Sequence, residues 1–210
     1  QLAARNLYDI VETIIDFSAV DNETLGLHPT EVSVAEAVAA AIDLVGERYK
    51  GGLPIPVETD VDQTLSVYAD RDRFGQVLRA LIDNAVKFSD SRGQVTVVAA
   101  RSPQRSMVRI AISDEGIGIA PQDLPRIFDR FYQADNTATR RYGGTGMGLA
   151  LVQRLVQAHG ATVLVETEVG QGTRVILEWP ETVDAAAEAA LELPPPEQTE
   201  PWELPAAGVQ

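Results

Sequence analysis

The chain has 210 residues, no cysteine and a formal net charge of −14 at pH 7. The length suits one ordinary domain with accessory segments, and the absence of cysteine excludes disulfides and thiolate metal sites. The acidic balance disfavours non-specific binding to nucleic acid, which needs a basic face. Because no stretch approaches 18 consecutive apolar residues, we expect no membrane-spanning segment here.

The first predicted element is a helix over residues 2–20. Leu7, Ile10, Ile14 and Phe17 follow the 3-4-3 spacing of the seam of a helical bundle. This spacing favours a helix between subunits, although a helix packed on its own domain stays open. Because the chain begins within the helical pattern, we expect it to be part of a longer polypeptide.

The next predicted elements alternate between helices and pairs of strands. After a loop over residues 21–30, Ser33 and Glu36 form a capping box, and Asp70 can cap a second helix. The predicted helices cover residues 33–49, 70–88, 121–127 and 145–159, and the predicted strands cover residues 55–61, 65–69, 94–100, 107–113, 162–166 and 173–179. The first strand contains Pro56 and is expected at an edge. This order predicts a two-layer α/β sandwich, in which a mixed sheet has helices on one face.

The last segment, residues 181–210, contains acidic residues, no basic residue and the run Pro194-Pro195-Pro196. Such a composition predicts a disordered or linker-like tail, with room for a short helix over residues 184–191.

A glycine-rich cluster at residues 143–149 opens the predicted helix at 145–159. Backbone N–H groups at a helix N-terminus bind anions, and glycines let a phosphate approach them. The cluster lacks the Gly-Lys-Ser/Thr of a P-loop, and its spacing differs from the dinucleotide fingerprint. A glycine-rich turn without a ligand is the alternative.

Two polar clusters accompany it. Asp114 follows an apolar strand and precedes Gly116 and Gly118, and a carboxylate there can accept a proton from the exocyclic amine of adenine. Asn84 and Lys87 lie three residues apart on one predicted helix, where an amide oxygen suits Mg²⁺ and an ammonium suits a phosphate. An Asx-turn and a solvated polar face are the respective alternatives.

In this order the clusters resemble the N, G1, F, G2 and G3 boxes of sensor histidine kinases. The matching segments are residues 81–88 (LIDNAVKF), 114–119 (DEGIGI), 127–132 (IFDRFY), 144–149 (GTGMGL) and 170–173 (GQGT). Residues 7–27 resemble the end of the second helix of the family's dimerisation hairpin. The resemblance implies a Bergerat-type ATP-binding domain over residues 28–180, preceded by the hairpin helix over 1–27 and followed by the tail over 181–210.

The resemblance also implies roles for individual residues in binding ATP and Mg²⁺. Asn84 would ligate Mg²⁺ and Lys87 would contact phosphate, whereas Asp114 would hold adenine. The other expected nucleotide contacts are Gly116, Gly118, Gly144, Thr145, Gly146, Gly148, Leu149 and Thr173. Phe128 and Phe131 would anchor a lid over residues 133–143, whose Arg140 and Arg141 either swing toward the γ-phosphate or stay solvated.

The implied activity is transfer of the ATP γ-phosphoryl group to a histidine on a helix outside this chain, for relay to an aspartate of a response regulator. Neither histidine present fits as the acceptor, because His28 lies in a loop before Pro29 and His159 lies at a helix end. Ala80 stands four residues before Asn84, where relatives that hydrolyse ATP have a glutamate base. Gln133 stands where many relatives have arginine, which puts one phosphate contact in doubt.

Two alternatives remain at this stage: another ATPase of the same fold, and a non-catalytic nucleotide-sensing module. The expected partners are a response regulator receiver domain and a second copy of the full-length protein through the helical bundle. We expect no nucleic acid, a cytoplasmic location for this portion, and membrane contact only through segments upstream of it.

Overall fold

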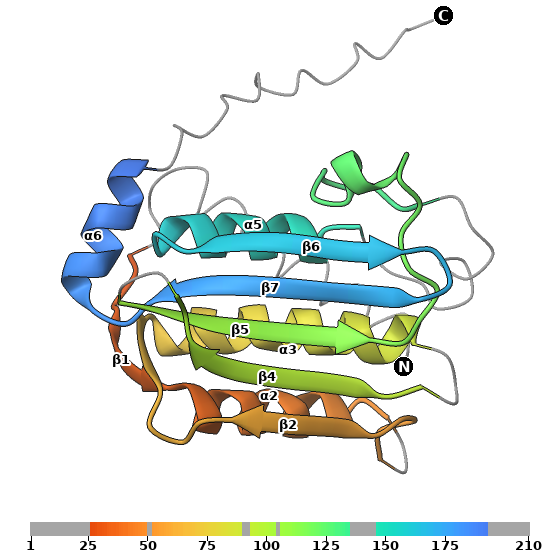
Figure 1. Cartoon of the computed structure of the whole chain (residues 1–210), viewed down its shortest axis with the longest axis horizontal. Coiled ribbons are helices and arrows are strands. Elements are labelled where there is room, and N and C mark those ends of the chain that lie inside the picture. The colour runs from red at the N-terminus through yellow and green to blue at the C-terminus, as the bar shows by residue number, and fades with distance from the viewer. Residues whose placement is uncertain (1–25, 50–51, 90–92, 104–105, 135–145, 193–210) are drawn as a thin grey trace, which may run out of the picture.

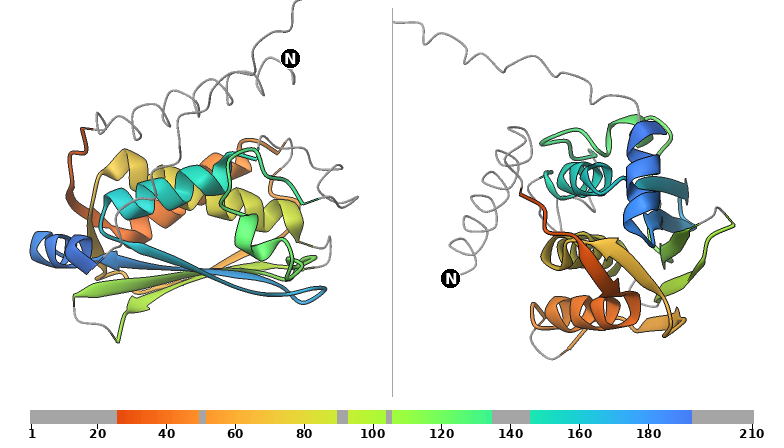
Figure 2. Two further views of the ribbon diagram at one scale, coloured as in Figure 1. Left: turned by 90° about the horizontal axis from the view of Figure 1, so that it is seen from above. Right: turned by 90° about the vertical axis from the view of Figure 1, so that its left-hand side faces the viewer.

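The computed structural model describes residues 26–49, 52–89, 93–103, 106–134 and 146–192. The helix predicted over residues 2–20 lies outside these ranges. Within them, helices cover one face of a five-stranded sheet and leave the other face open (Figures 1 and 2). The predicted fold class, a two-layer α/β sandwich with a mixed sheet, is therefore confirmed.

The five-stranded sheet has the order β2-β4-β5-β7-β6, in which β2 is parallel to β4 and the other pairs are antiparallel. Its strands are β2 (Val57–Val61), β4 (Val95–Arg101), β5 (Met107–Asp114), β7 (Gly172–Pro180) and β6 (Thr162–Glu168). In β4, Val95, Val97 and Ala99 are buried, so alternate side chains face the helices. β2 lies at an edge, as Pro56 predicts.

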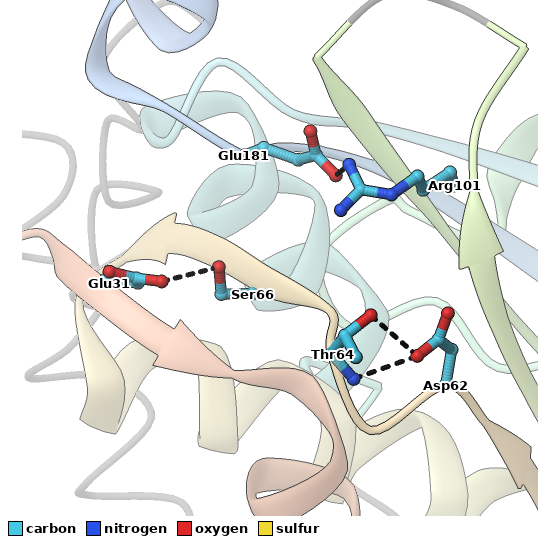
Figure 3. A network of polar contacts seen from close by, with 6 residues as sticks. All are labelled: Glu31, Asp62, Thr64, Ser66, Arg101 and Glu181. Atoms are coloured by element: carbon cyan, nitrogen blue, oxygen red, sulfur yellow. Dashed lines mark hydrogen bonds and ion pairs between the residues drawn. The ribbon is translucent and has the colours of Figure 1, made fainter.

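A second sheet pairs β1 (Thr30–Ser33) with β3 (Ser66–Ala69). The sequence prediction is wrong at β1, because it places a loop over residues 21–30 and a helix from residue 33, with no strand between them. Four residues give too little alternation to predict a strand, and β1 is stabilised by non-local contacts instead. Val32 is fully buried, and Ser66 Oγ donates to Glu31 Oε1 at 2.8 Å (Figure 3).

The helices of the covered face are α2 (Val34–Gly46), α3 (Arg71–Phe88) and α5 (Gly148–Ala158) (Figure 2). Ser33 caps α2 by accepting from Glu36 N, as the capping box predicts. The helix ends at Gly46 instead of near Tyr49, because the hydrogen bond from Arg48 N to Val45 O tightens the chain into a turn.

α3 is the central helix. Asp70 Oδ1 accepts from Asp72 N and Arg73 N, both at 3.1 Å, so Asp70 is the predicted N-cap. The predicted apolar stripe is buried at Phe74, Leu78, Leu81 and Ala85. This packing places the C-terminal turn of α3, with Asn84 and Lys87, near the end of β5.

The remaining elements are short. The helix predicted over residues 121–127 is the single 3₁₀ turn η1 (Leu124–Arg126), with Pro125 inside it. α6 (Val183–Glu192) corresponds to the short helix expected over residues 184–191 and lies beyond the end of the sheet (Figure 1). Arg101 Nη1, on β4, forms an ion pair of 2.7 Å with Glu181 Oε1 just before α6 (Figure 3).

Candidate functional site

The candidate site lies where the end of α3, the loop after β5 and the β6–β7 turn meet. Ile117 N donates to Phe88 O at 3.2 Å, and Gly170 N donates to Ile117 O at 2.8 Å. Ser89 also forms an isolated bridge with Gly116. The loop after β5 is thus held by backbone bonds on both sides.

The predicted glycines of this loop are required by the closeness of these neighbours. A Cβ at Gly116 would contact Phe88 O, and it would lie 2.7 Å from Asp114 Oδ1. Gly118 has a φ of +64°, and a Cβ there would contact Glu168 O of β6. Any larger residue would push the loop away from α3 or from the β6–β7 turn.

Asp114 ends β5 with one carboxylate oxygen held by the protein. Its Oδ1 accepts from Gly116 N at 3.0 Å and from Thr173 N at 3.3 Å. Among the described residues, Oδ2 has no hydrogen-bond partner. Burial raises the pKa of the Asp114 carboxyl to about 6, although the two N–H groups act in the opposite direction. The second oxygen can therefore accept a hydrogen bond from a ligand.

Thr173 and Thr167 continue the line of Asp114 across the sheet. Asp114 is paired with Thr173, and Thr173 with Thr167, as direct cross-strand neighbours. Thr167 Oγ1 accepts from Ile119 N and donates to Gly172 O, both at 2.9 Å. Thr173 is predicted from its sequence motif, whereas Thr167 is not, because a lone threonine in a strand carries no local signal.

Asn84 and Lys87 lie on the last two turns of α3, and both side chains are half-buried. Burial lowers the pKa of the Lys87 ammonium, while Asp83 raises it and Arg48 lowers it. Arg48 Nη1 forms an ion pair of 3.0 Å with Asp83 Oδ2, so a negative charge lies between the two positive charges of Arg48 and Lys87. Lys87 Nζ lies 5.5 Å from the centroid of the Phe88 ring.

The start of α5 lies toward the same end of α3. His159, just after α5, accepts a hydrogen bond from Asp70 N at the start of α3, so the two packed helices run antiparallel. Met147 is the N-cap of α5 and makes no side-chain capping bond. Gly148 begins the helix, and Leu149 is half-buried against the core. The first N–H groups and the positive end of the helix dipole suit an anion.

Only part of the predicted lid can be placed, because Arg140, Arg141, Gly144 and Thr145 lie outside the described residues. Gly146 has its backbone against that of Phe131 and Tyr132.

The two predicted lid anchors differ in burial. Phe128 is half-buried, but Phe131 is 69% exposed and has a φ of +62°. The expected role of Phe131 at the lid base stays a prediction, because residues 135–143 of the lid lie outside the described residues. Tyr132 has well-defined contacts in this segment: its Oη donates to Asp123 Oδ1 at 2.7 Å, and Arg126 stacks 4.3 Å from its ring centroid.

The two histidines make contacts that stabilise the fold and do not point to a role as phosphoacceptor. His159 is 5% exposed; its Nδ1 lies 2.7 Å from Leu155 O and its Nε2 accepts from Asp70 N at 3.1 Å. Burial lowers its pKa, so it is held neutral with the proton on Nδ1. His28 is exposed, and its backbone N donates to Asp70 Oδ2. Neither imidazole is placed near Asn84 or Lys87.

In the described part of the chain, no group of three or more His, Cys, Asp or Glu residues is arranged to hold a metal ion. Within the same ranges, no helix combines the length and the hydropathy of a bilayer-spanning segment.

The helices on one face of a mixed sheet, with a half-engaged carboxylate at the end of β5, define a Bergerat-type α/β sandwich. A sequence profile described as histidine kinase-, DNA gyrase B- and HSP90-like ATPase matches residues 69–183, more than half of the chain. The chain belongs to this family.

Curated relatives and solved structures narrow the similarity to sensor histidine kinases. A sensor-like histidine kinase of Rhizobium meliloti is 37% identical over 186 residues, which is 87% of this chain and 34% of the relative. The histidine protein kinase DivJ of Caulobacter vibrioides is 35% identical over 182 residues, 83% of this chain and 29% of DivJ. The crystal structure of full-length ShkA with AMPPNP superimposes with a TM-score of 0.70 at 32% identity, covering 83% of this chain and 35% of ShkA. The chain thus spans about a third of these relatives.

Proposed function

We propose that this chain is the ATP-binding catalytic portion of a sensor histidine kinase. In this proposal it binds Mg-ATP and transfers the γ-phosphoryl group to a histidine on a helix outside this chain. The observation that carries the proposal is the Asp114 carboxylate, which has one oxygen fixed by Gly116 N and Thr173 N and the other left for a ligand. Family membership and the AMPPNP complex of ShkA support the same assignment.

The base end fits adenine. A carboxylate accepts hydrogen bonds and cannot donate them, so Asp114 would bind the 6-amino group and repel a 6-oxo group. Gly116 and Gly118 keep the loop beside it close to α3 and β6. A flat base therefore has an acceptor at one side and a backbone wall at the other.

The phosphate end fits the triphosphate by charge. Lys87 and the first turn of α5 would face the phosphates, and Gly146 and Gly148 permit close approach of the backbone there. Asn84 would ligate Mg²⁺ together with the phosphate oxygens, which supply the ligands that the described side chains lack. Bound Mg²⁺ would neutralise phosphate charge during transfer.

The residues present favour transfer over hydrolysis. Ala80 lies one turn before Asn84 and packs against the core, so that turn has no carboxylate at this position to activate water. The catalytic contribution of this chain is then positioning and charge neutralisation by Asn84, Lys87 and α5. The acceptor imidazole would come from a dimerisation hairpin, whose second helix we propose for residues 1–27.

The proposed partners follow from this activity. They are a receiver domain of a response regulator, which takes the phosphoryl group onto an aspartate, and a second copy joined through the helical hairpin. We propose a cytoplasmic location for this portion, where ATP is available.

The experiment has two stages. Calorimetric titration of the chain with Mg-ATP should show saturable binding, and omission of Mg²⁺ should weaken it. Supplying a hairpin that carries an acceptor histidine, with ATP radiolabelled in the γ-phosphate, should then yield acid-labile label on that histidine. If the folded protein shows no heat of binding with Mg-ATP, the proposal is refuted, because phosphoryl transfer depends on nucleotide binding.

The second stage also separates the alternatives. Steady release of phosphate without label on the hairpin would identify an ATPase of the same fold. Saturable binding with neither release nor transfer would identify a nucleotide-sensing module. Either result would support the proposed nucleotide site and would refute the assignment of the chain to a kinase.

A further inference from the structure

Three polar side chains form one row across the sheet at the candidate site. Asp114 on β5, Thr173 on β7 and Thr167 on β6 are successive cross-strand partners. Two residues away on each of the first two strands, Ile112 is buried and Val175 packs on the core, so the row faces the helix-covered side. The row therefore belongs to the wall that would face the base of the nucleotide.

The hydrogen bonds of Thr167 fix the direction of its proton. A threonine hydroxyl has one proton and two lone pairs. Ile119 N can only donate to it and Gly172 O can only accept from it, each at 2.9 Å. The Thr167 proton is thus used on Gly172 O, and one lone pair is used on Ile119 N–H.

One lone pair of Thr167 Oγ1 remains, and Thr173 Oγ1 lies 3.1 Å away. Either hydroxyl could donate in this contact, but only donation by Thr173 satisfies all three contacts of Thr167 Oγ1 at once, so we assign the Thr173 proton to Thr167. Thr173 Oγ1 then presents lone pairs, and no proton, to a ligand. Next to it, Asp114 Oδ2 is also an acceptor.

We propose that Thr167 is a specificity-determining positioning residue: it orients the Thr173 hydroxyl so that Asp114 and Thr173 offer only acceptors at the 6-position of a purine. This inference rests on the proposed function and adds a residue to it. A 6-amino purine satisfies both acceptors, directly or through a water. A 6-oxo purine places an acceptor against acceptors, which costs binding free energy.

The test compares ATP with inosine triphosphate, which has a carbonyl where ATP has the 6-amino group. Thr167→Val removes the hydroxyl at similar size and releases the Thr173 proton, which can then donate to the carbonyl. The preference for ATP over inosine triphosphate, measured as a ratio of calorimetric Kd values, should fall about tenfold, the effect of one hydrogen bond. Thr167→Ser keeps the hydroxyl and should retain most of the ratio. Thr162→Val, on the outward face of the same strand, is the matched control.

The outcomes separate this proposal from the function it rests on. If the unmutated chain binds neither nucleotide, the proposed function fails first. If it binds ATP but Thr167→Val weakens both nucleotides equally, Thr167 is only structural and the proposal is overturned. The same follows if Thr167→Ser behaves like Thr167→Val.

A second variant covers the case in which Thr167→Val does not fold. Thr173→Val removes the oriented acceptor itself and should lower the same ratio. The double variant should then match Thr173→Val, because Thr167 acts through Thr173. An unchanged ratio in Thr173→Val would contradict the proposal without any use of Thr167→Val.

Discussion

A titratable side chain lies at each of two ends of the molecule, the buried His159 and the half-buried Asp114. The two differ in how many of their hydrogen-bonding atoms have a partner in the protein. At the start of α3, the imidazole of His159 has both ring nitrogens bonded, to Leu155 O and Asp70 N. At the far end, Asp114 has one oxygen bonded and the other available among the described residues. Burial shifts both pKa values, so the shift alone does not mark a site. The unused hydrogen-bonding capacity of Asp114 does.

The surroundings of His159 reinforce the contrast. Its ring lies 5.0 Å from that of Trp179, which is fully buried and stacks edge-on against Phe74 at 4.8 Å. Trp179 Nε1 donates to Tyr68 O at 3.3 Å, which connects β7 to β3. These contacts connect α3, α5, β3 and β7 at this end of the molecule.

The largest effect should come from Asp114→Asn. The amide cannot offer the same charged acceptor, so Mg-ATP affinity should fall by about 100-fold. Thermal stability should stay unchanged or rise, because the variant removes a half-buried charge whose desolvation raises the pKa of the carboxyl. Calorimetry and a thermal melt on the same sample measure both. The control is Asp60→Asn, which changes an exposed carboxylate on β2. Unchanged ATP affinity in Asp114→Asn would refute the assignment of Asp114 to the adenine site.

His159→Ala should produce the opposite pair of results. Removing the ring leaves Leu155 O and Asp70 N without their partner and a cavity beside Trp179, which should cost about 3 kcal/mol of unfolding free energy. The folded fraction should still bind Mg-ATP with nearly native affinity. Urea denaturation measures the first quantity, and His28→Ala, at an exposed side chain, is the control. A loss of affinity as large as that of Asp114→Asn would remove the distinction between the two ends.

The pH dependence of stability should have opposite signs at the two ends. Burial raises the pKa of Asp114 to about 6, so its contribution to stability is present at low pH and is lost as pH rises through about 6. Burial lowers the pKa of His159 below 6.5, so its contribution is present above pH 6.5 and is lost as pH falls. The test measures melting temperatures between roughly pH 4.5 and 7.5, in steps of about half a unit, for the unmutated chain, Asp114→Asn and His159→Ala. Each variant should lack the pH dependence of stability that its residue contributes.

Nucleotide affinity adds a second pH test at the Asp114 end. If only the carboxylate accepts the 6-amino group, Mg-ATP binding should weaken by up to about tenfold per pH unit below 6. Asp114→Asn should lack this part of the dependence, while titration of the nucleotide itself is common to both proteins. Equal slopes for the two would show that another group is responsible.

The sequence predicts the site where its signal is local. Asn84 and Lys87 share a helix face, and the glycines at 116 and 118 follow Asp114 directly, so spacing alone suggests their chemistry. Thr167 is different, because its role depends on its register against Thr173 and on the return of Ile119 from another loop. Such a contact exists only after three strands have paired.

The same limit explains the errors in the fold. β1 has four residues, and its strand conformation comes from pairing with β3, more than 30 residues away. The motif around Phe131 likewise does not reveal its positive φ or its largely exposed ring. By contrast, the Asp70 cap and the stripe of α3 were predictable, because a helix is specified by residues within one or two turns of each other.

The smallest predicted effects lie at the lid base. There Tyr132, whose hydroxyl is hydrogen-bonded, can be compared with its neighbour Phe131, whose ring is exposed. Tyr132→Phe removes the hydrogen bond to Asp123 and should cost about 1 kcal/mol of unfolding free energy. Phe131→Ala should cost less than about 0.5 kcal/mol, because its ring is largely exposed. Denaturant titrations of both variants, with and without Mg-ATP, make the test. If Phe131→Ala costs more without nucleotide than Tyr132→Phe, the ring packs in solution and the lid is anchored as the sequence motif implies. If Phe131→Ala lowers the unfolding free energy only when nucleotide is present, the exposed ring of Phe131 becomes buried in the nucleotide complex. Phe131 would then resemble Asp114, whose free oxygen also gains a contact only when the ligand binds.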